Sequence, residues 1–119
     1  MRAWASPEVV EKIVSLGRES AEEVCGVVLP DCQVVALPNT ATTDRSRAYV
    51  IQMDDLLDTI VSWAEEHGKC AADLDTEDVI IWHTHPSGNV GASPGDLDAR
   101  VEGFRYLVVA LPDGQATMF

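Results

Sequence analysis

Basic residues are scarce in this sequence. Lys and Arg number 8 against 20 Asp and Glu in 119 residues, which gives a formal net charge of −12. A surface of that charge repels the phosphate backbone of nucleic acids, and no cluster of Lys or Arg offsets the repulsion. We therefore expect no nucleic-acid partner, and the acidity favours solubility or a basic partner.

Long apolar runs are also missing. No stretch approaches the roughly 20 apolar residues that a membrane-spanning helix needs. The first ten residues, MRAWASPEVV, lack the apolar core that is typical of a signal peptide. We expect a cytoplasmic protein with no membrane association.

The sequence has no cysteine framework either. Its three cysteines, Cys25, Cys32 and Cys70, form neither a C-x-x-C pair nor a zinc-ribbon spacing. An odd number argues against a set of disulfides and fits a reducing compartment. Cys25 lies in an apolar run and is predicted to be a small core residue.

The composition that remains is that of one folded domain, residues 1–119. Hydrophobic residues make up 46% and charged residues 24% of the chain, and we find no internal repeat. This length is close to the commonest domain size and is enough for one hydrophobic core.

Hydrophobic periodicity and turn residues predict an α/β fold. Ser6 and Pro7 are typical of a helix start, and Gly68 of a helix end. Leu97 and Val101 are expected to point inward from a third helix, which begins at 94. The predicted elements, in chain order, are a helix at 7–17, a hairpin of strands at 23–29 and 33–37, a short strand at 48–52, a helix at 53–67 with Met53, Leu56, Leu57, Ile60 and Ala64 as its apolar stripe, an acidic connector at 69–77, a strand from 79 into His83, a helix from 94, and strands at 106–111 and 115–119.

This order of elements predicts a mixed β-sheet flanked by about three helices. It does not predict which strands pair. An exposed edge strand near Phe119 would be compatible with a homodimer.

The residues with the clearest chemistry follow the strand that begins at 79. His83 and His85 are two residues apart, so their side chains point to the same face of a strand and can reach one ion. A loop of small residues follows, and Asp96, near the start of the next helix, can return a carboxylate to the same point. Two His and one carboxylate leave the fourth tetrahedral position to water, an arrangement typical of a catalytic zinc.

Each of these residues also has a purely structural interpretation. A His-x-His pair on a strand is often a surface or core feature. Ser93, Pro94 and Asp96 together are also an ordinary helix start, with a capping serine, proline at the first position and an early acid. Only the combination of these residues beside an apolar strand favours a metal site.

The combination resembles the signature of the JAMM (MPN+/JAB) zinc metalloproteases. HTHP at 83–86, six residues at 87–92 and SPGD at 93–96 fill each fixed position of His-[Ser/Thr]-His-Pro, six residues, Ser-x-x-Asp. EVCGVVL at 23–29 is similar to the Glu-x-x-Gly and aliphatic run that the family carries in an early strand. The resemblance spans nearly the whole chain and implies the MPN/JAB, cytidine-deaminase-like architecture.

The resemblance also implies roles for single residues. His83, His85 and Asp96 would be the ligands of one Zn²⁺ per chain. Glu23 would be the general base that takes a proton from the attacking water and passes it to the leaving amine, and Ser93 would help to stabilise the oxyanion. The neighbouring Glu22 is out of register with the family's glycine.

The short loop at 87–92 is similar to that of the compact prokaryotic and phage branch of the family. The implied function is a metallopeptidase or isopeptidase that cleaves an amide bond in the extended tail of a peptide or protein substrate, such as a ubiquitin-like or sulfur-carrier protein. An alternative is a phage tail-assembly protein that acts mainly as an interaction module, and a RadC-like JAB protein is a weaker one. Glu23 favours the enzyme, because a binding module needs no base.

Other polar residues are assigned lesser roles. Thr84 should point away from the ligands and support the loop, and His67 should sit at a helix end without binding metal. Trp82 is expected in the core. Ser87 and Asn89 are left open as substrate contacts.

Overall fold

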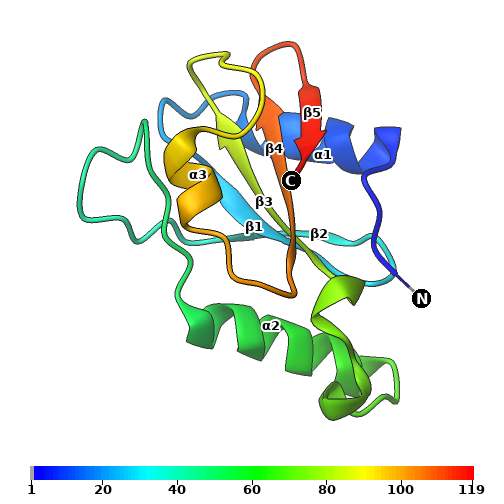
Figure 1. Ribbon diagram of the computed structural model, residues 1–119. Helices are drawn as coiled ribbons and strands as arrows, with labels where there is room; N and C mark the ends of the chain where they lie inside the picture. The colour runs from blue at the N-terminus through cyan, green and yellow to red at the C-terminus, as the bar shows by residue number, and fades with distance from the viewer. Residues whose placement is uncertain (1) are drawn as a thin grey trace.

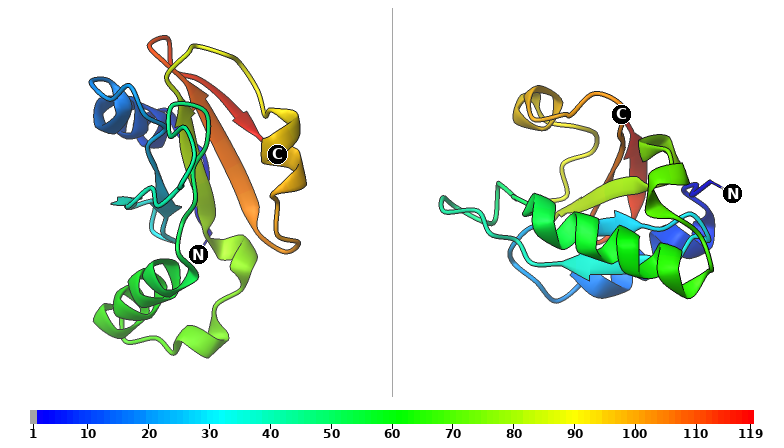
Figure 2. Two further views of the ribbon diagram at one scale, coloured as in Figure 1. Left: turned by 90° about the vertical axis from the view of Figure 1, so that its left-hand side faces the viewer. Right: turned by 90° about the horizontal axis from the view of Figure 1, so that it is seen from below.

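The computed structural model describes residues 2–119 as a mixed five-stranded sheet between helical layers (Figures 1 and 2). The regular elements are α1 (Pro7–Gly17), β1 (Cys25–Val28), β2 (Val34–Leu37), α2 (Met53–Glu66), the 3-10 turns η1 (Ala71–Asp73) and η2 (Thr76–Asp78), β3 (Ile80–His85), α3 (Pro94–Asp98), β4 (Arg105–Ala110) and β5 (Gln115–Met118). The predicted fold class, an α/β domain with a mixed sheet and three helices, is therefore confirmed.

The strand order in the sheet is β2-β1-β3-β4-β5. Only β3 and β4 run parallel, while the β1–β2, β1–β3 and β4–β5 pairs are antiparallel. The predicted hairpin at 23–37 is present, and β5 is an edge strand as expected. The central strand, β3, is thus held on both sides and carries the His-x-His pair at its end.

The two faces of the sheet bury different residues because side chains alternate along each strand. Ile80 and Trp82 of β3 pack with α1 on one face, whereas Ile81 packs with α2 on the other. His83 and His85 lie two and four residues after Ile81 on the same strand, so their side chains point to the same face, which is the α2 face. The two helices accordingly belong to separate core clusters.

Gly26 allows the central strands to pack closely. It lies opposite Trp82 in the antiparallel register of β1 and β3. A Cβ at this position would overlap with the carbonyl oxygen of Val35 and would lie 2.8 Å from the Trp82 indole. The glycine of the Glu-x-x-Gly pattern therefore has a packing reason, and Trp82 is fully buried, as predicted.

The predicted strand at 48–52 is wrong. Its β-favouring residues have no neighbouring strand to pair with. The side chain of Asn39 instead makes hydrogen bonds to the backbone of this segment. The Asn39 amide donates to the Ala48 carbonyl at 3.0 Å and accepts from the Val50 N–H at 3.2 Å. These contacts and the bond from the Thr40 N–H to the Val50 carbonyl fix the segment without making it part of the sheet.

Two predicted apolar faces are also only partly buried. In α2, Leu56 and Ala64 are buried together with Trp63, but Met53 and Leu57 lie at the border of the stripe and are each 48% exposed. α3 ends at Asp98 and contacts the rest of the fold little, so Leu97 and Val101 are exposed rather than inward. Figure 1 shows α3 standing in front of the sheet, apart from both helical layers.

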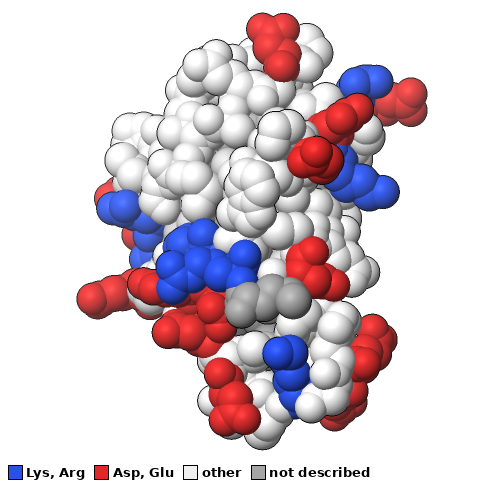
Figure 3. Space-filling view, turned by 90° about the vertical axis from the view of Figure 1, so that its right-hand side faces the viewer, with Lys and Arg blue, Asp and Glu red and all other residues white. Residues whose placement is uncertain are grey.

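Charge is distributed in small groups on the face seen in Figure 3. Basic side chains gather there in a few groups that border acidic side chains, and the upper left of this face is uncharged. The exposed Arg2–Glu77 ion pair, at 3.2 Å, is an example of such mixing. Within residues 2–119 no helix combines the length and apolar character required to cross a membrane.

Candidate metal centre

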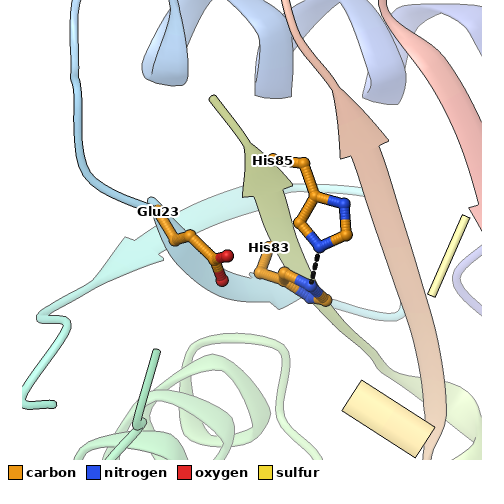
Figure 4. A group of neighbouring side chains, drawn as sticks. All are labelled: Glu23, His83 and His85. Carbon is orange, nitrogen blue, oxygen red and sulfur yellow. Dashed lines mark hydrogen bonds between the residues drawn. The ribbon is translucent and has the colours of Figure 1, made fainter. Parts of the chain in front are cut away.

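His83 and His85 end β3 with their imidazoles turned toward each other (Figure 4). Their Nε2 atoms are 3.3 Å apart. His83 is fully buried, and His85 is 6% exposed. The two-residue spacing on a strand therefore places both rings on one face, as the sequence predicts.

Asp96 reaches the same point from the first turn of α3. The helix starts with a reciprocal cap, in which Ser93 Oγ accepts from the Asp96 N–H at 3.0 Å and Asp96 Oδ2 accepts from the Ser93 N–H at 2.9 Å. Gly88 and Gly91 adopt positive φ values of 85° and 84°, which lets the chain double back after β3. Asp96 Oδ2 consequently lies 3.1 Å from the Nε2 atom of each histidine.

The ring of His85 is oriented through its other nitrogen. Nδ1 lies 3.0 Å from the Asn89 carbonyl oxygen, which can only accept, so Nδ1 is the donor in this contact. Nε2 is thereby turned toward Asp96 Oδ2. A contact of this kind at the second nitrogen is typical of histidines that bind metal.

The pKa of Asp96 supports an ionised carboxylate. Burial alone would raise this pKa, but hydrogen bonds from His83 and from the Ser93 N–H, together with the nearby histidine charges, lower it below its usual range. Burial lowers the pKa of His83, although Asp96 opposes that effect, so its imidazole is kept in the neutral form that binds metals.

The three donor atoms are spaced as ligands of one ion. The separations are 3.1, 3.1 and 3.3 Å. Donors bound tetrahedrally to zinc at about 2.0–2.1 Å lie about 3.3 Å from one another. The residues present therefore fit a tetrahedral ion of zinc type, with two imidazoles and one carboxylate as its donors.

Glu23 lies beside this cluster, just before β1. Its ligand atom and those of His83 and His85 all lie within 4.8 Å of one another, and the three could hold a metal ion. Figure 4 shows the Glu23 carboxyl group pointing toward the two rings from the segment that leads into the neighbouring strand. The sheet thus joins residues that are far apart in the sequence.

The Glu23 carboxyl group is buried in an unusual environment. Glu23 is 4% exposed, and its Oε1 atom has no hydrogen-bond partner among the described residues. Burial, with a smaller contribution from the charge of Asp96, raises its pKa to about 8. Such a carboxyl group can hold a proton near neutral pH, whereas the neighbouring Glu22 is exposed to solvent.

Backbone contacts fix the position of Glu23. Its N–H donates to the Arg45 carbonyl at 2.7 Å, and its own carbonyl accepts from the Asn39 side chain at 2.9 Å. The next residue, Val24, donates its N–H to Thr84 Oγ1 at 3.0 Å. Thr84 therefore points away from the metal ligands, as predicted, but it anchors the segment that carries Glu23 rather than the loop.

Sequence reasoning missed Tyr49. Its ring stacks on the His83 imidazole, with 4.3 Å between the centroids and 20° between the planes. The Nδ1 atom of His83 has no hydrogen-bond partner in the described chain. The stacking on Tyr49 and the packing of neighbouring side chains therefore orient the His83 imidazole. Tyr49 lies in the irregular segment before α2, where no spacing relates it to His83.

A cleft of about 480 Å³ opens over the cluster. Glu23, His85 and Ser93 line it, together with Ser87 and Asn89, the two residues that the sequence left open as substrate contacts. His67 lies outside this region: its ring stacks on Trp63, and its Nδ1 lies 2.7 Å from the Trp63 carbonyl oxygen. A ligand entering the cleft would meet the carboxyl group, one histidine and the serine together.

Neither a family model nor a curated protein matches the chain. A solution structure of a protein from Salinibacter ruber is similar to it, with 23% sequence identity and a TM-score of 0.47. The similarity covers 99% of this chain and 78% of that one.

Proposed function

We propose that this chain is a zinc-dependent metallopeptidase of the JAMM type, which hydrolyses an amide bond in an extended peptide tail. The observation that carries the proposal is the cluster of His83 Nε2, His85 Nε2 and Asp96 Oδ2, at separations of 3.1–3.3 Å, beside the buried carboxyl group of Glu23. Structural zinc sites are closed by four protein ligands, whereas three ligands next to a base are typical of hydrolases.

A zinc ion held by His83, His85 and Asp96 would supply Lewis acidity toward the attacking water and the substrate carbonyl. The protein must supply the proton transfers. The buried Glu23 carboxyl group, whose Oε1 atom has no hydrogen-bond partner among the described residues, is placed to accept a proton from water and donate it to the leaving amine.

Ser93 is placed to assist without binding metal. Its Oγ accepts from the Asp96 N–H, which leaves the hydroxyl hydrogen available for a second contact. Ser93 also lines the cleft next to Glu23 and His85. A hydroxyl donor at this place stabilises negative charge that develops on the substrate carbonyl oxygen.

The first test is the metal content of the full chain purified without chelator, measured by elemental analysis. We expect one zinc per chain in the wild type and none in His83→Ala or Asp96→Asn. Glu23→Gln should retain zinc but lose hydrolysis of a mixed peptide library, whereas the exposed neighbour Glu22→Gln should change neither.

Two outcomes would contradict the proposal. A wild-type chain that takes up no zinc after zinc is supplied would exclude the metallopeptidase. Full zinc occupancy without hydrolysis of peptides or of ubiquitin-like conjugates would instead favour the interaction module implied by the phage tail-assembly resemblance.

A further inference from the structure

A second cavity, of about 220 Å³, lies on the α2 side of the sheet. Ile81 of β3 and Tyr106 of β4 form its floor, and the irregular segment around Tyr49 forms one wall. Ala99 and Val101, which follow α3, line the side of the pocket opposite the sheet. No residue that lines this pocket carries a charge, although charged residues make up 24% of the chain.

The pocket adjoins the candidate metal centre through a single side chain. Tyr49 lines the pocket and stacks on His83 with 4.3 Å between ring centroids. Ile81, in the floor, precedes His83 by two residues on the same face of β3. A group in this pocket is thus separated from a proposed metal ligand by one aromatic ring.

The walls leave apolar surface uncovered. Val50, Met53 and Val101 are 45%, 48% and 50% exposed. The Val101 segment is nevertheless tied to the floor, because its N–H donates to the Tyr106 hydroxyl at 2.8 Å. This hydrogen bond joins two lining segments of the pocket, and an apolar occupant would remove the exposed surface from water.

We propose that this pocket, lined by Tyr49, Ile81, Ala99, Val101 and Tyr106, binds an aliphatic side chain of the peptide substrate close to the scissile amide. The inference rests on the proposed peptidase function and defines its substrate class. The volume is below the roughly 300–1,000 Å³ of small-molecule sites, so it suits one side chain rather than a cofactor. The absence of lining charges disfavours Asp, Glu, Lys and Arg, whose desolvation nothing in the pocket would offset.

The polar cleft and the apolar pocket adjoin different parts of the centre. Glu23, His85 and Ser93 face the cleft, while Tyr49 brings the pocket to His83. An extended peptide advances about 3.3 Å per residue. We therefore place the scissile amide in the cleft beside Glu23 and a neighbouring side chain of the same extended peptide in the pocket.

Binding can be tested separately from catalysis. The ¹⁵N-labelled full chain carrying Glu23→Gln is titrated with acetyl-Gly-Leu-Gly-amide, and with the same peptide containing Ala or Asp at the centre. We expect the Leu peptide to shift the amide signals of Ile51, Ala99 and Val101 saturably. It should bind about 10-fold more tightly than the Asp peptide, because only Leu buries apolar surface there.

Ala99→Leu fills the pocket from an exposed position, so folding should survive and the preference for Leu should disappear. Ala72→Leu makes the same change at an exposed alanine in η1, and it should keep the preference. Equal binding of the Leu and Asp peptides would overturn the proposal, as would a Leu preference that persists in Ala99→Leu.

Turnover by the zinc-loaded wild type separates this proposal from the proposed function. Hydrolysis with a Leu preference that Ala99→Leu abolishes would support both. Selective binding of the Leu peptide without hydrolysis would support the pocket as a side-chain site and exclude the peptidase function. Hydrolysis at equal rates for the Leu and Asp peptides would support the peptidase function and exclude the proposed role of the pocket.

Discussion

The ring of Tyr49 lies against the imidazole of His83, with 4.3 Å between centroids and 20° between planes. Metal-binding histidines are usually oriented by a hydrogen bond from their second nitrogen. The second nitrogen of His83 lacks such a partner in the described chain, so a stacked ring performs the orienting role.

Removal of this ring should weaken metal binding. Tyr49→Ala is expected to lower zinc affinity about 10-fold, the smaller end of the losses seen when outer-shell partners are removed. Tyr49→Phe keeps the ring and should leave the affinity unchanged. Competition with a chromophoric chelator measures both variants, and an equal loss in Phe and Ala would show that the hydroxyl group, rather than the ring, is responsible.

Zinc should stabilise the fold through the same cluster. An ion that binds only the folded state adds about 2.7 kcal/mol to the free energy of unfolding when its free concentration is 100 times its Kd. Chemical denaturation with and without zinc should show this gain in the wild type. Asp96→Asn removes the charge of the shared ligand, and a comparable gain in that variant would argue that zinc binds elsewhere.

The buried carboxyl group of Glu23 should make the stability of the metal-free chain depend on pH. Its pKa is 4.5 in an ordinary environment and about 8 in the fold, so the folded state binds the proton more tightly. The stabilisation linked to this proton is complete below about pH 4.5 and is lost as the pH rises toward 8.

Glu23→Gln cannot titrate, so it should gain stability relative to the wild type across that range, by at most about 1.4 kcal/mol per pH unit. Urea denaturation of chelator-treated protein at several pH values measures the difference. Glu22→Gln provides the exposed control, for which the difference should stay flat. A flat profile for Glu23→Gln as well would show that Glu23 is not buried as described.

Two glycines should respond to alanine with opposite signs. Gly26→Ala places a methyl group against the Val35 carbonyl and the Trp82 ring, and should cost about 3 kcal/mol or more of unfolding free energy. A Cβ at Gly95 meets only Ser93 Oγ at 3.8 Å within α3, so Gly95→Ala should add up to about 1 kcal/mol. Denaturant titrations compare the two, and equal effects would contradict the packing described for β1 and β3.

Asn39 should matter for stability through its contacts with the backbone. Its side chain makes hydrogen bonds to the Glu23 and Ala48 carbonyls and from the Ala41 and Val50 amides. At about 0.5–1.5 kcal/mol for each of these four hydrogen bonds, Asn39→Ala should cost about 2–6 kcal/mol. The exposed Thr43→Ala in the same loop is the control, and a similar small loss in both variants would rule out this role for Asn39.

Local patterns predicted most of the elements because each depends on neighbours in the chain. The Ser6 cap with its following proline gives α1 as predicted, and Gly68, at a φ of 65°, follows the end of α2. The strand at 48–52 failed because a strand requires a partner, which residue type alone does not supply. α3 is too short to bury Leu97, which periodicity placed inside.

The candidate site divides in the same way. His83, His85 and Asp96 lie close in the sequence, so strand alternation and a helix start bring them together, and the structure places them as their spacing predicts. The position of Glu23 depends on the register between β1 and β3, which only the family resemblance indicated. Tyr49 depends on the path of an irregular segment, and no sequence signal marks it.

The parts of the candidate site also differ in what holds them together. The three proposed ligands come from one stretch, β3 to α3, whereas Glu23 is held beside them by the pairing of β1 with β3 and by the hydrogen bond between Val24 and Thr84. In the proposed enzyme, a change that loosens this pairing would therefore separate the base from the metal while leaving the three ligands together.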